Sequence, residues 1–311
     1  MTKHCLVTLM AVLILACIFV QTSVAAVVVG SCKTGVQFST IQGAVNASPS
    51  GATIDICPGT YPEQVSITKN LTLTGVSSGT SDAAVVVPPS GGLVTNGNDI
   101  FGNPVAAQVF VQGATATISH LTVDGNGNGL SGCATDIMGI YFQNSPGKII
   151  DNAVRNQILG SADLGCQVGL AINVESNSGT PAVTISSNSV RNYQKNGITA
   201  SGPGTSGGPV VTITSNTVIG IGATTAIAQN GIQIGFGSTG EANSNHVIDD
   251  IYINPPNCGS ACYGSSGILI YASSGVIASS NTVESTQLGI VPATDPTYGP
   301  ADGTTVNGNH I

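Results

Sequence analysis

Asp249 and Asp250 form a pair of adjacent carboxylates, the residue type that hydrolyses glycosidic bonds. In such chemistry one carboxyl group protonates the leaving oxygen while the other activates water or attacks the sugar. Consecutive residues of a strand point to opposite faces, so neighbouring aspartates need not meet one substrate. We take Asp249 and Asp250 as the catalytic candidates, with a solvated turn as the alternative interpretation.

Three basic residues form a second pattern. Arg155 and Arg191 each stand between a valine and an asparagine in successive repeats, and Lys195 follows shortly after. Stacked arginines can bind the carboxylate of a uronate through paired hydrogen bonds. These residues are the substrate-binding candidates, and exposed side chains without a ligand are the alternative.

The segment Asp124-Gly-Asn-Gly-Asn-Gly129 matches the first half of a calcium-binding loop. Asp124, Asn126 and Asn128 would supply the ligands, but Thr135 stands where the closing glutamate belongs. A glycine-rich connection between repeats is the alternative. The sequence otherwise indicates no metal and no cofactor.

The first 25 residues have the three parts of a secretory signal peptide. A short basic start precedes an uncharged stretch over residues 5–20, and small residues around Ala25 suit cleavage. A retained membrane anchor and lipidation at Cys17 are the alternatives. We expect a mature domain over residues 26–311 that is secreted, periplasmic or on the cell surface, with no membrane span after signal removal.

Six cysteines remain in this mature domain, an even number that suits disulfides in an oxidising compartment. Proximity in the sequence suggests the pairs Cys32–Cys57, Cys133–Cys166 and Cys258–Cys262, although other pairings are open. A zinc site is the alternative, but the sequence has no Cys-x-x-Cys pair, and the histidines of the mature domain are only His120, His246 and His310.

The chain repeats itself from residue 139 onward with two alternating phrases. The first is glycine followed by an apolar residue, at Gly139, Gly169, Gly197, Gly231, Gly267 and Gly289. The second begins with asparagine and ends in valine or isoleucine, at Asn152, Asn188, Asn216, Asn245, Asn281 and Asn309. Asparagine spacings of 28 to 36 residues indicate a solenoid, in which stacked asparagines would form a hydrogen-bonded ladder.

Within each repeat, apolar and polar residues alternate with a period of two. Such short strands, stacked at intervals of about 30 residues, describe a parallel β-helix. A capping segment at about residues 36–50 would hold a short helix with an N-cap at Ser39. The sequence stops inside an Asn-x-Ile phrase, which leaves open self-association through an uncapped C-terminal end.

The composition limits the partners of the protein. Seven Lys+Arg against fifteen Asp+Glu give a net charge of -8, unlike proteins that bind nucleic acid by neutralising phosphates. This charge would also repel anionic polymers, and the tyrosines and phenylalanines are few and scattered. A polysaccharide or cell-surface glycan is the expected partner, and a neutral glycan is compatible with the charge.

Residues 38–47, 58–63 and 65–75 closely resemble the opening of pectinesterases and of many proteins of the pectin lyase-like superfamily. The resemblance implies an all-β fold, a right-handed parallel β-helix with a short N-terminal capping helix. The later motifs of pectinesterases are missing: Asp99-Ile-Phe-Gly102 is similar to the nucleophile motif but follows the opening too closely. The motifs of polygalacturonases and pectate lyases are not found either.

We therefore expect a secreted β-helix protein that binds or processes extracellular polysaccharide. A non-catalytic structural or adhesive protein of the cell surface is the alternative. If the protein is an enzyme, the resemblance implies a polysaccharide lyase, a glycoside hydrolase or a carbohydrate esterase.

Overall fold

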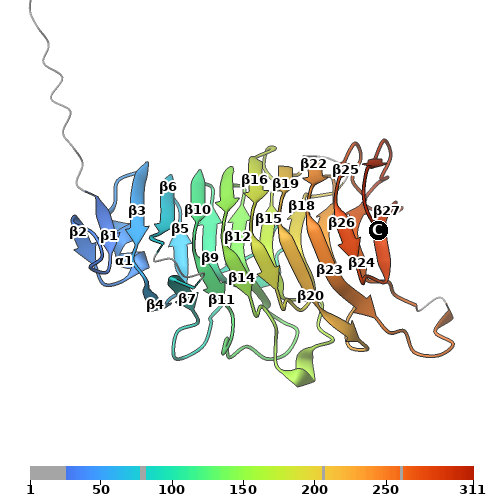
Figure 1. Cartoon of the computed structure of the whole chain (residues 1–311), viewed down its shortest axis with the longest axis horizontal. Coiled ribbons are helices and arrows are strands. Elements are labelled where there is room, and N and C mark those ends of the chain that lie inside the picture. Colours follow the sequence, from blue (N-terminus) through green and yellow to red (C-terminus); the bar gives the residue numbers. More distant parts are fainter. Residues whose placement is uncertain (1–25, 78–81, 205–206, 260–261) are drawn as a thin grey trace, which may run out of the picture.

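Short strands separated by tight corners wind the chain into a solenoid whose coils stack along its long axis (Figure 1). The computed structural model describes residues 26–77, 82–204, 207–259 and 262–311. The expected signal peptide, residues 1–25, lies outside the described residues.

The strands of successive coils pair in parallel and build three sheets, here named A, B and C. Sheet A runs β2 (Val36–Phe38), β1 (Val27–Val29), β3 (Ala52–Ile56), β6 (Leu71–Gly75), β10 (Ala116–Ser119), β13 (Gly147–Ile150), β16 (Ala182–Ser186), β19 (Val210–Thr214), β22 (Thr239–Asn243), β25 (Ile277–Ser279) and β28 (Thr305–Asn307). Sheet B runs β4 (Gly59–Pro62), β7 (Ala84–Val87), β11 (Thr122–Asp124), β14 (Ala153–Arg155), β17 (Ser189–Arg191), β20 (Thr217–Thr224), β23 (His246–Tyr252) and β26 (Thr282–Glu284). Sheet C runs β5 (Val65–Ile67), β9 (Pro104–Gln112), β12 (Asp136–Gln143), β15 (Leu170–Glu175), β18 (Asn196–Ser201), β21 (Asn230–Gly235), β24 (Ser266–Tyr271) and β27 (Leu288–Ala293). The short β8 (Gly97–Asn98) joins β9 in antiparallel direction. The prediction of an all-β, right-handed parallel β-helix is confirmed.

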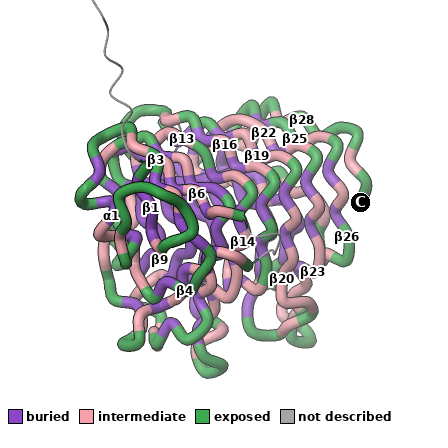
Figure 2. The backbone as a smooth tube through the Cα atoms, turned by 60° about the vertical axis from the view of Figure 1, so that its left-hand side comes forward, coloured by how far each residue is buried: buried purple, intermediate pink, exposed green. Residues whose placement is uncertain are grey.

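The core is a column of apolar side chains that point into the coil. One row of sheet C stacks an isoleucine on an isoleucine from β12 to β27, at Ile140, Ile172, Ile198, Ile232, Ile268 and Ile290. Stiff β-branched side chains pack well in this way on a pleated surface. Figure 2 shows buried residues, in purple, recurring from coil to coil, with exposed residues, in green, in many of the loops.

The glycine of the repeated Gly-Ile phrase allows sheet C to approach sheet B. A Cβ atom on Gly231 would lie 2.2 Å from Val247 Cγ1, which is closer than any real contact. In β15 the equivalent position is Ala171, because Ile172 pairs with Ile140 while Leu170 pairs with Met138. Gly169-Leu170 is therefore not a copy of this phrase, and its assignment from the sequence was wrong by two residues.

The six asparagines of the second phrase stack at one corner of the coil. Asn216 Oδ1 accepts hydrogen bonds from the backbone N–H and the Nδ2 of Asn188, both at 2.9 Å, and the pattern repeats up to Asn309. Each Nδ2 group also donates to a backbone carbonyl, as Asn216 does to Ile185. This ladder satisfies buried backbone groups that the corners would otherwise leave unpaired.

The N-terminal end of the coil is covered by α1 (Ile41–Ala47). The N-cap is Thr40, whose side chain accepts a hydrogen bond from Gly43 N–H, rather than the expected Ser39. Ile41 buries its side chain against the first coil, and Glu63 accepts hydrogen bonds from the N–H groups of Ile41 and Gln42. Within the described ranges no helix is long and apolar enough to cross a membrane.

The three cysteine pairs expected from proximity are present as disulfides, Cys32–Cys57, Cys133–Cys166 and Cys258–Cys262. Cys133–Cys166 joins the loop before β12 to the loop before β15, which also contains the short 3-10 helix η1 (Ser161–Asp163). Disulfides persist in oxidising compartments, so these three suit an extracellular protein.

Candidate functional site

The catalytic candidates Asp249 and Asp250 do not meet on one surface. Asp250 points into the coil, has no exposed surface, and accepts a hydrogen bond of 2.7 Å from the Tyr193 hydroxyl. Burial, opposed by this bond, raises the pKa of Asp250 well above its usual value. Asp249 is only partly buried and has a positive φ of 66°. The pair is split between two faces, as strand geometry allows.

Arg155 and Arg191 stack in register on β14 and β17, but Arg155 is already paired. Its Nε lies 2.7 Å from Asp124 and its guanidinium lies 2.9 Å from Asp82. Arg191 is exposed beside it. Two carboxylates thus occupy the Arg155 fork that would otherwise bind a uronate.

The calcium candidates have protein partners of their own. Although burial opposes it, hydrogen bonds from Asn156, the Asn126 backbone and Arg155 lower the pKa of Asp124. Asn128 is buried, and its Nδ2 donates to the carbonyls of Gly125 and Ile158. In the described part of the chain no three His, Cys, Asp or Glu side chains gather as metal ligands.

Lys195 lies elsewhere, beside the outward face of sheet C. Its Nζ donates a hydrogen bond of 2.7 Å to the Ala228 carbonyl, and burial lowers its pKa to about 8. Of the predicted substrate-binding residues, Lys195 is the one that lines the principal groove of this face.

This groove has a volume of about 500 Å³ and lies over β12 to β24. Parallel pairing places the outward side chains of the strands in rows across it. The first row contains Tyr141, Asn173, Thr199, Gln233 and Leu269. The second row contains Gln143, Glu175, Ser201, Gly235 and Tyr271. Two cavities of about 470 and 450 Å³ adjoin the groove, because Gln167 lines all three.

The acid Asp136 stands at the start of β12 and lines the groove. Burial raises its pKa to about 8, against the opposing hydrogen bond of 2.8 Å from Gly169 N–H, and the negative charges of Glu175 and Asp99 raise it further. With such a pKa, Asp136 is mostly protonated at neutral pH, as a general acid must be.

Glu175, at the end of β15, is 5% exposed and has three hydrogen-bond donors. Its oxygen atoms accept from the Tyr141 hydroxyl at 2.7 Å, Asn173 Nδ2 at 3.0 Å and Ile100 N–H at 3.2 Å. Burial raises the pKa of Glu175, and the three donors oppose that rise. The three donors fix the positions of both carboxyl oxygen atoms of Glu175 in the groove.

The surroundings of Glu175 are rigid. Tyr141 stacks on Phe110 with 4.8 Å between ring centroids, and its hydroxyl also accepts from Gln143 Nε2 at 2.9 Å. Gln143 in turn donates to the Asn98 carbonyl in β8. This chain of contacts ties the β8–β9 hairpin to the groove and places the nearby Asp99 at its rim.

Neutral amides continue the groove beyond these acids. Asn230 Nδ2 lies 3.1 Å from Asn196 Oδ1, and both side chains lie near Gln233 Oε1 at 3.3 Å. Amide groups both donate and accept hydrogen bonds, which suits the hydroxyl groups of a sugar. The groove thus combines two acids, Asp136 and Glu175, whose pKa values are both raised by burial, with neutral polar side chains.

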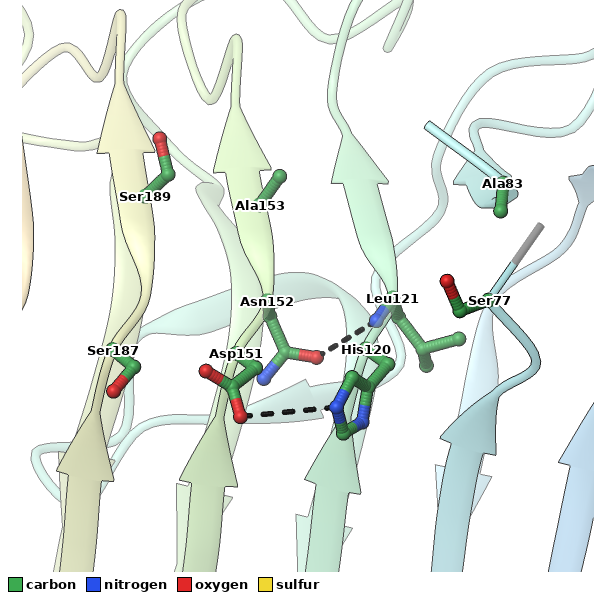
Figure 3. Close-up of a pocket in the computed structure, with 9 residues that line it drawn as sticks. All are labelled: Ser77, Ala83, His120, Leu121, Asp151, Asn152, Ala153, Ser187 and Ser189. Atoms are coloured by element: carbon green, nitrogen blue, oxygen red, sulfur yellow. Dashed lines mark hydrogen bonds and ion pairs between the residues drawn. The ribbon is translucent and has the colours of Figure 1, made fainter. Parts of the chain in front are cut away.

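Another hollow lies at the asparagine corner and is shown in Figure 3. His120 and Asp151 point toward one another there, 3.8 Å apart, with about half of each side chain exposed. Asp151 stands between His120 and Ser187, so this serine does not reach the imidazole (Figure 3). His120, Asp151 and Ser187 therefore do not form the contact through which a histidine activates a serine nucleophile.

Comparison with known proteins identifies the architecture. The structure aligns with pectin methylesterase PemA from Erwinia chrysanthemi, with a TM-score of 0.52 and 14% identity over 93% of this chain and 91% of that one. The chain has the pectin lyase-like β-helix fold. It also aligns with the GH136 lacto-N-biosidase from Eubacterium ramulus, with a TM-score of 0.54, 13% identity and 86% of this chain. That alignment covers 52% of the lacto-N-biosidase, so this chain matches about half of the larger protein.

No family model matches this pectin lyase-like chain, and no curated protein matches it. At such low identity, the structural likeness shows the fold alone. The groove acids Asp136 and Glu175 were missed from the sequence, because they stand 39 residues apart and show no motif. Correct alignment of Ala171-Ile172 with Gly139-Ile140 would have placed Glu175 in the outward row.

Proposed function

We propose that this exported β-helix protein binds a neutral glycan in the sheet C groove and hydrolyses a glycosidic bond there. The observation that carries the proposal is the pair of acids in this groove. Asp136 has a pKa of about 8, while Glu175 is surrounded by three hydrogen-bond donors. Burial raises the pKa of both carboxyl groups, and we assign Asp136 as the acid because of its pKa of about 8, and Glu175 as the base because its oxygen atoms are placed to accept.

In the proposed reaction, Asp136 gives its proton to the glycosidic oxygen as the bond from that oxygen to the anomeric carbon breaks. A water molecule attacks the anomeric carbon, and Glu175 accepts the proton that this water loses. The products are two shorter sugars, and both carboxyl groups then exchange their protons with solvent. The amides of Asn196, Asn230 and Gln233 would bind the sugar hydroxyl groups.

Charge and fold support a neutral substrate. The net charge of -8 and the acids of the groove repel polyuronates, and Arg155 is paired with Asp82 and Asp124. The lacto-N-biosidase that shares this fold is consistent with a glycan as substrate. The three disulfides and the expected signal peptide, residues 1–25, are consistent with action outside the cell.

The first test measures reducing ends released from neutral polysaccharides by wild type, Asp136→Asn and Asp250→Asn. Loss of general acid catalysis predicts a fall in kcat of roughly 100-fold or more for Asp136→Asn. The same isosteric change at Asp250, buried in the coil, serves as the control and leaves kcat within about twofold.

The pH dependence adds a second reading of the same reaction. The wild-type rate should fall above about pH 8 as Asp136 loses its proton. The pKa of Lys195 is also about 8, so Lys195 could cause the same fall. If Asp136 is the cause, the rate of the Lys195→Met variant should still fall above about pH 8. Binding of glycan without turnover in wild type would contradict the hydrolase and favour a non-catalytic surface role.

A further inference from the structure

Four aromatic rings gather at one end of the groove, although aromatic residues are rare in the chain. Phe236 is the centre of the group, and its ring centroid lies 5.7 Å from Phe101, 5.2 Å from Tyr271 and 4.9 Å from Tyr298. All three neighbours meet Phe236 edge to face, at angles of 64°, 66° and 85°. We call these four residues the aromatic cluster.

The aromatic cluster is continuous with the groove and open to solvent. Phe101, Phe236 and Tyr271 line the same cavity as Asp136 and Glu175. Phe101 is 48% exposed and Tyr298 is 38% exposed. Large exposed aromatic side chains grouped beside a polar groove mark a binding surface rather than a core.

One carboxylate, Asp295, holds two members of the cluster in place. The Tyr271 hydroxyl donates a hydrogen bond to it, while Asp295 Oδ1 accepts from the N–H groups of Thr297 at 2.8 Å and Tyr298 at 3.0 Å. The hydrogen bond to Asp295 raises the pKa of Tyr271 to about 12. The rings are therefore oriented before any ligand arrives, which lowers the entropy lost on binding.

Phe236 itself has an unfavourable backbone conformation. Its φ of 55° lies in the left-handed region, which is unfavourable for a bulky side chain. The corresponding corners after β12 and β24 hold Asn144 and Ala272 at φ values of 51° and 49°. Asparagine would relieve part of this strain at position 236, so the phenylalanine ring is not explained by the corner alone.

We propose that the aromatic cluster is a subsite that stacks on the apolar face of a neutral hexopyranose ring of the glycan. A pyranose with equatorial hydroxyl groups presents axial C–H bonds on a flat face, and the negative face of an aromatic ring attracts them. The carboxylates of Asp295 and Asp99 would repel a uronate at this place. The inference rests on the proposed function, because it assigns the substrate class for the same groove.

The test measures the affinity of cellohexaose and of hexagalacturonate by titration calorimetry. The two exposed rings are removed together in a Phe101→Ala, Tyr298→Ala variant, and Ile277→Ala on sheet A removes an exposed apolar side chain elsewhere. We expect wild type and Ile277→Ala to bind cellohexaose equally, and the double variant to bind it at least about tenfold more weakly. Tyr271→Phe, which keeps the ring but loses the bond to Asp295, should lie between them.

Three outcomes would overturn the subsite: equal affinity of wild type and the double variant, preference for hexagalacturonate, or no binding of cellohexaose. The melting temperature of each variant is measured as a control, to separate a loss of binding from a loss of structure. The activity assay separates this inference from the proposed hydrolysis. Cellohexaose that binds at the cluster without being cleaved supports the subsite and contradicts the hydrolase. A glycan that wild type and the double variant cleave equally well supports the hydrolase and contradicts the subsite.

Discussion

At the residue scale, the Asp136 carboxyl group is mostly protonated in the folded protein at neutral pH, because burial raises its pKa from 3.8 to about 8. Between these two values the unfolded chain has released the proton that the folded protein keeps. The folded state thus binds more protons than the unfolded state, and its stability falls as the pH rises through this window. Loss of this proton, which leaves a buried charge, therefore makes the fold less stable in alkaline solution.

Asp136→Asn should remove this dependence, because an amide has the same shape and no charge to desolvate. We expect its melting temperature to exceed that of wild type by at least about 2 °C at pH 8, and the difference to shrink toward pH 4. Scanning calorimetry from pH 4 to pH 9 measures it. Asp302→Asn, at an exposed position, is the control that should show a constant difference. A stability gap that does not change with pH would contradict the raised pKa of Asp136.

At the element scale, the disulfide Cys133–Cys166 fixes the two loops that set the position of Asp136. Cys133 stands three residues before Asp136, and Cys166 stands three residues before Gly169, whose N–H donates to the Asp136 carboxyl group. Loss of this cross-link should loosen the contact, expose the carboxyl group to water and lower its pKa. In the Cys133→Ser, Cys166→Ser variant, activity should therefore begin to fall at a lower pH than in wild type.

We expect the alkaline limb of the pH–rate profile of this variant to shift down by at least about one unit, with kcat reduced about tenfold. The Cys258→Ser, Cys262→Ser variant also lacks a disulfide but keeps the cross-link between these two loops. The alkaline limb of its pH–rate profile should therefore match that of wild type. If both variants shift together, general destabilisation rather than the position of Asp136 is responsible.

The same elements explain what the sequence could and could not predict. The repeated asparagines and the alternation of apolar residues predicted the coil, since both recur wherever one coil packs on the next. Proximity predicted the disulfides because successive coils bring Cys133 and Cys166 together, while Cys258 and Cys262 lie in a single loop. The site followed no repeat: its acids come from different coils, and the raised pKa of Asp136 depends on burial that no local pattern encodes. Asp250 was misleading because its neighbour in sequence faces the other way.

At the scale of the whole molecule, the fold is a stack in which each coil is stabilised by the coils on both sides. The asparagine ladder makes this dependence measurable, since Asn216 lies in the middle and Asn309 at the end of the described ladder. Asn216→Ala would leave the N–H of Asn188 and the carbonyl of Ile185 buried without their partners.

An unpaired buried polar group costs about 1–3 kcal/mol, so Asn216→Ala should lower the free energy of unfolding by roughly 2–4 kcal/mol. Asn309 also accepts from Asn281, but these bonds are only partly buried, so Asn309→Ala should cost less than half as much. Urea unfolding followed by circular dichroism measures both values. Because water can replace a lost partner only where the corner is partly exposed, equal costs would contradict a ladder whose contribution depends on burial between coils.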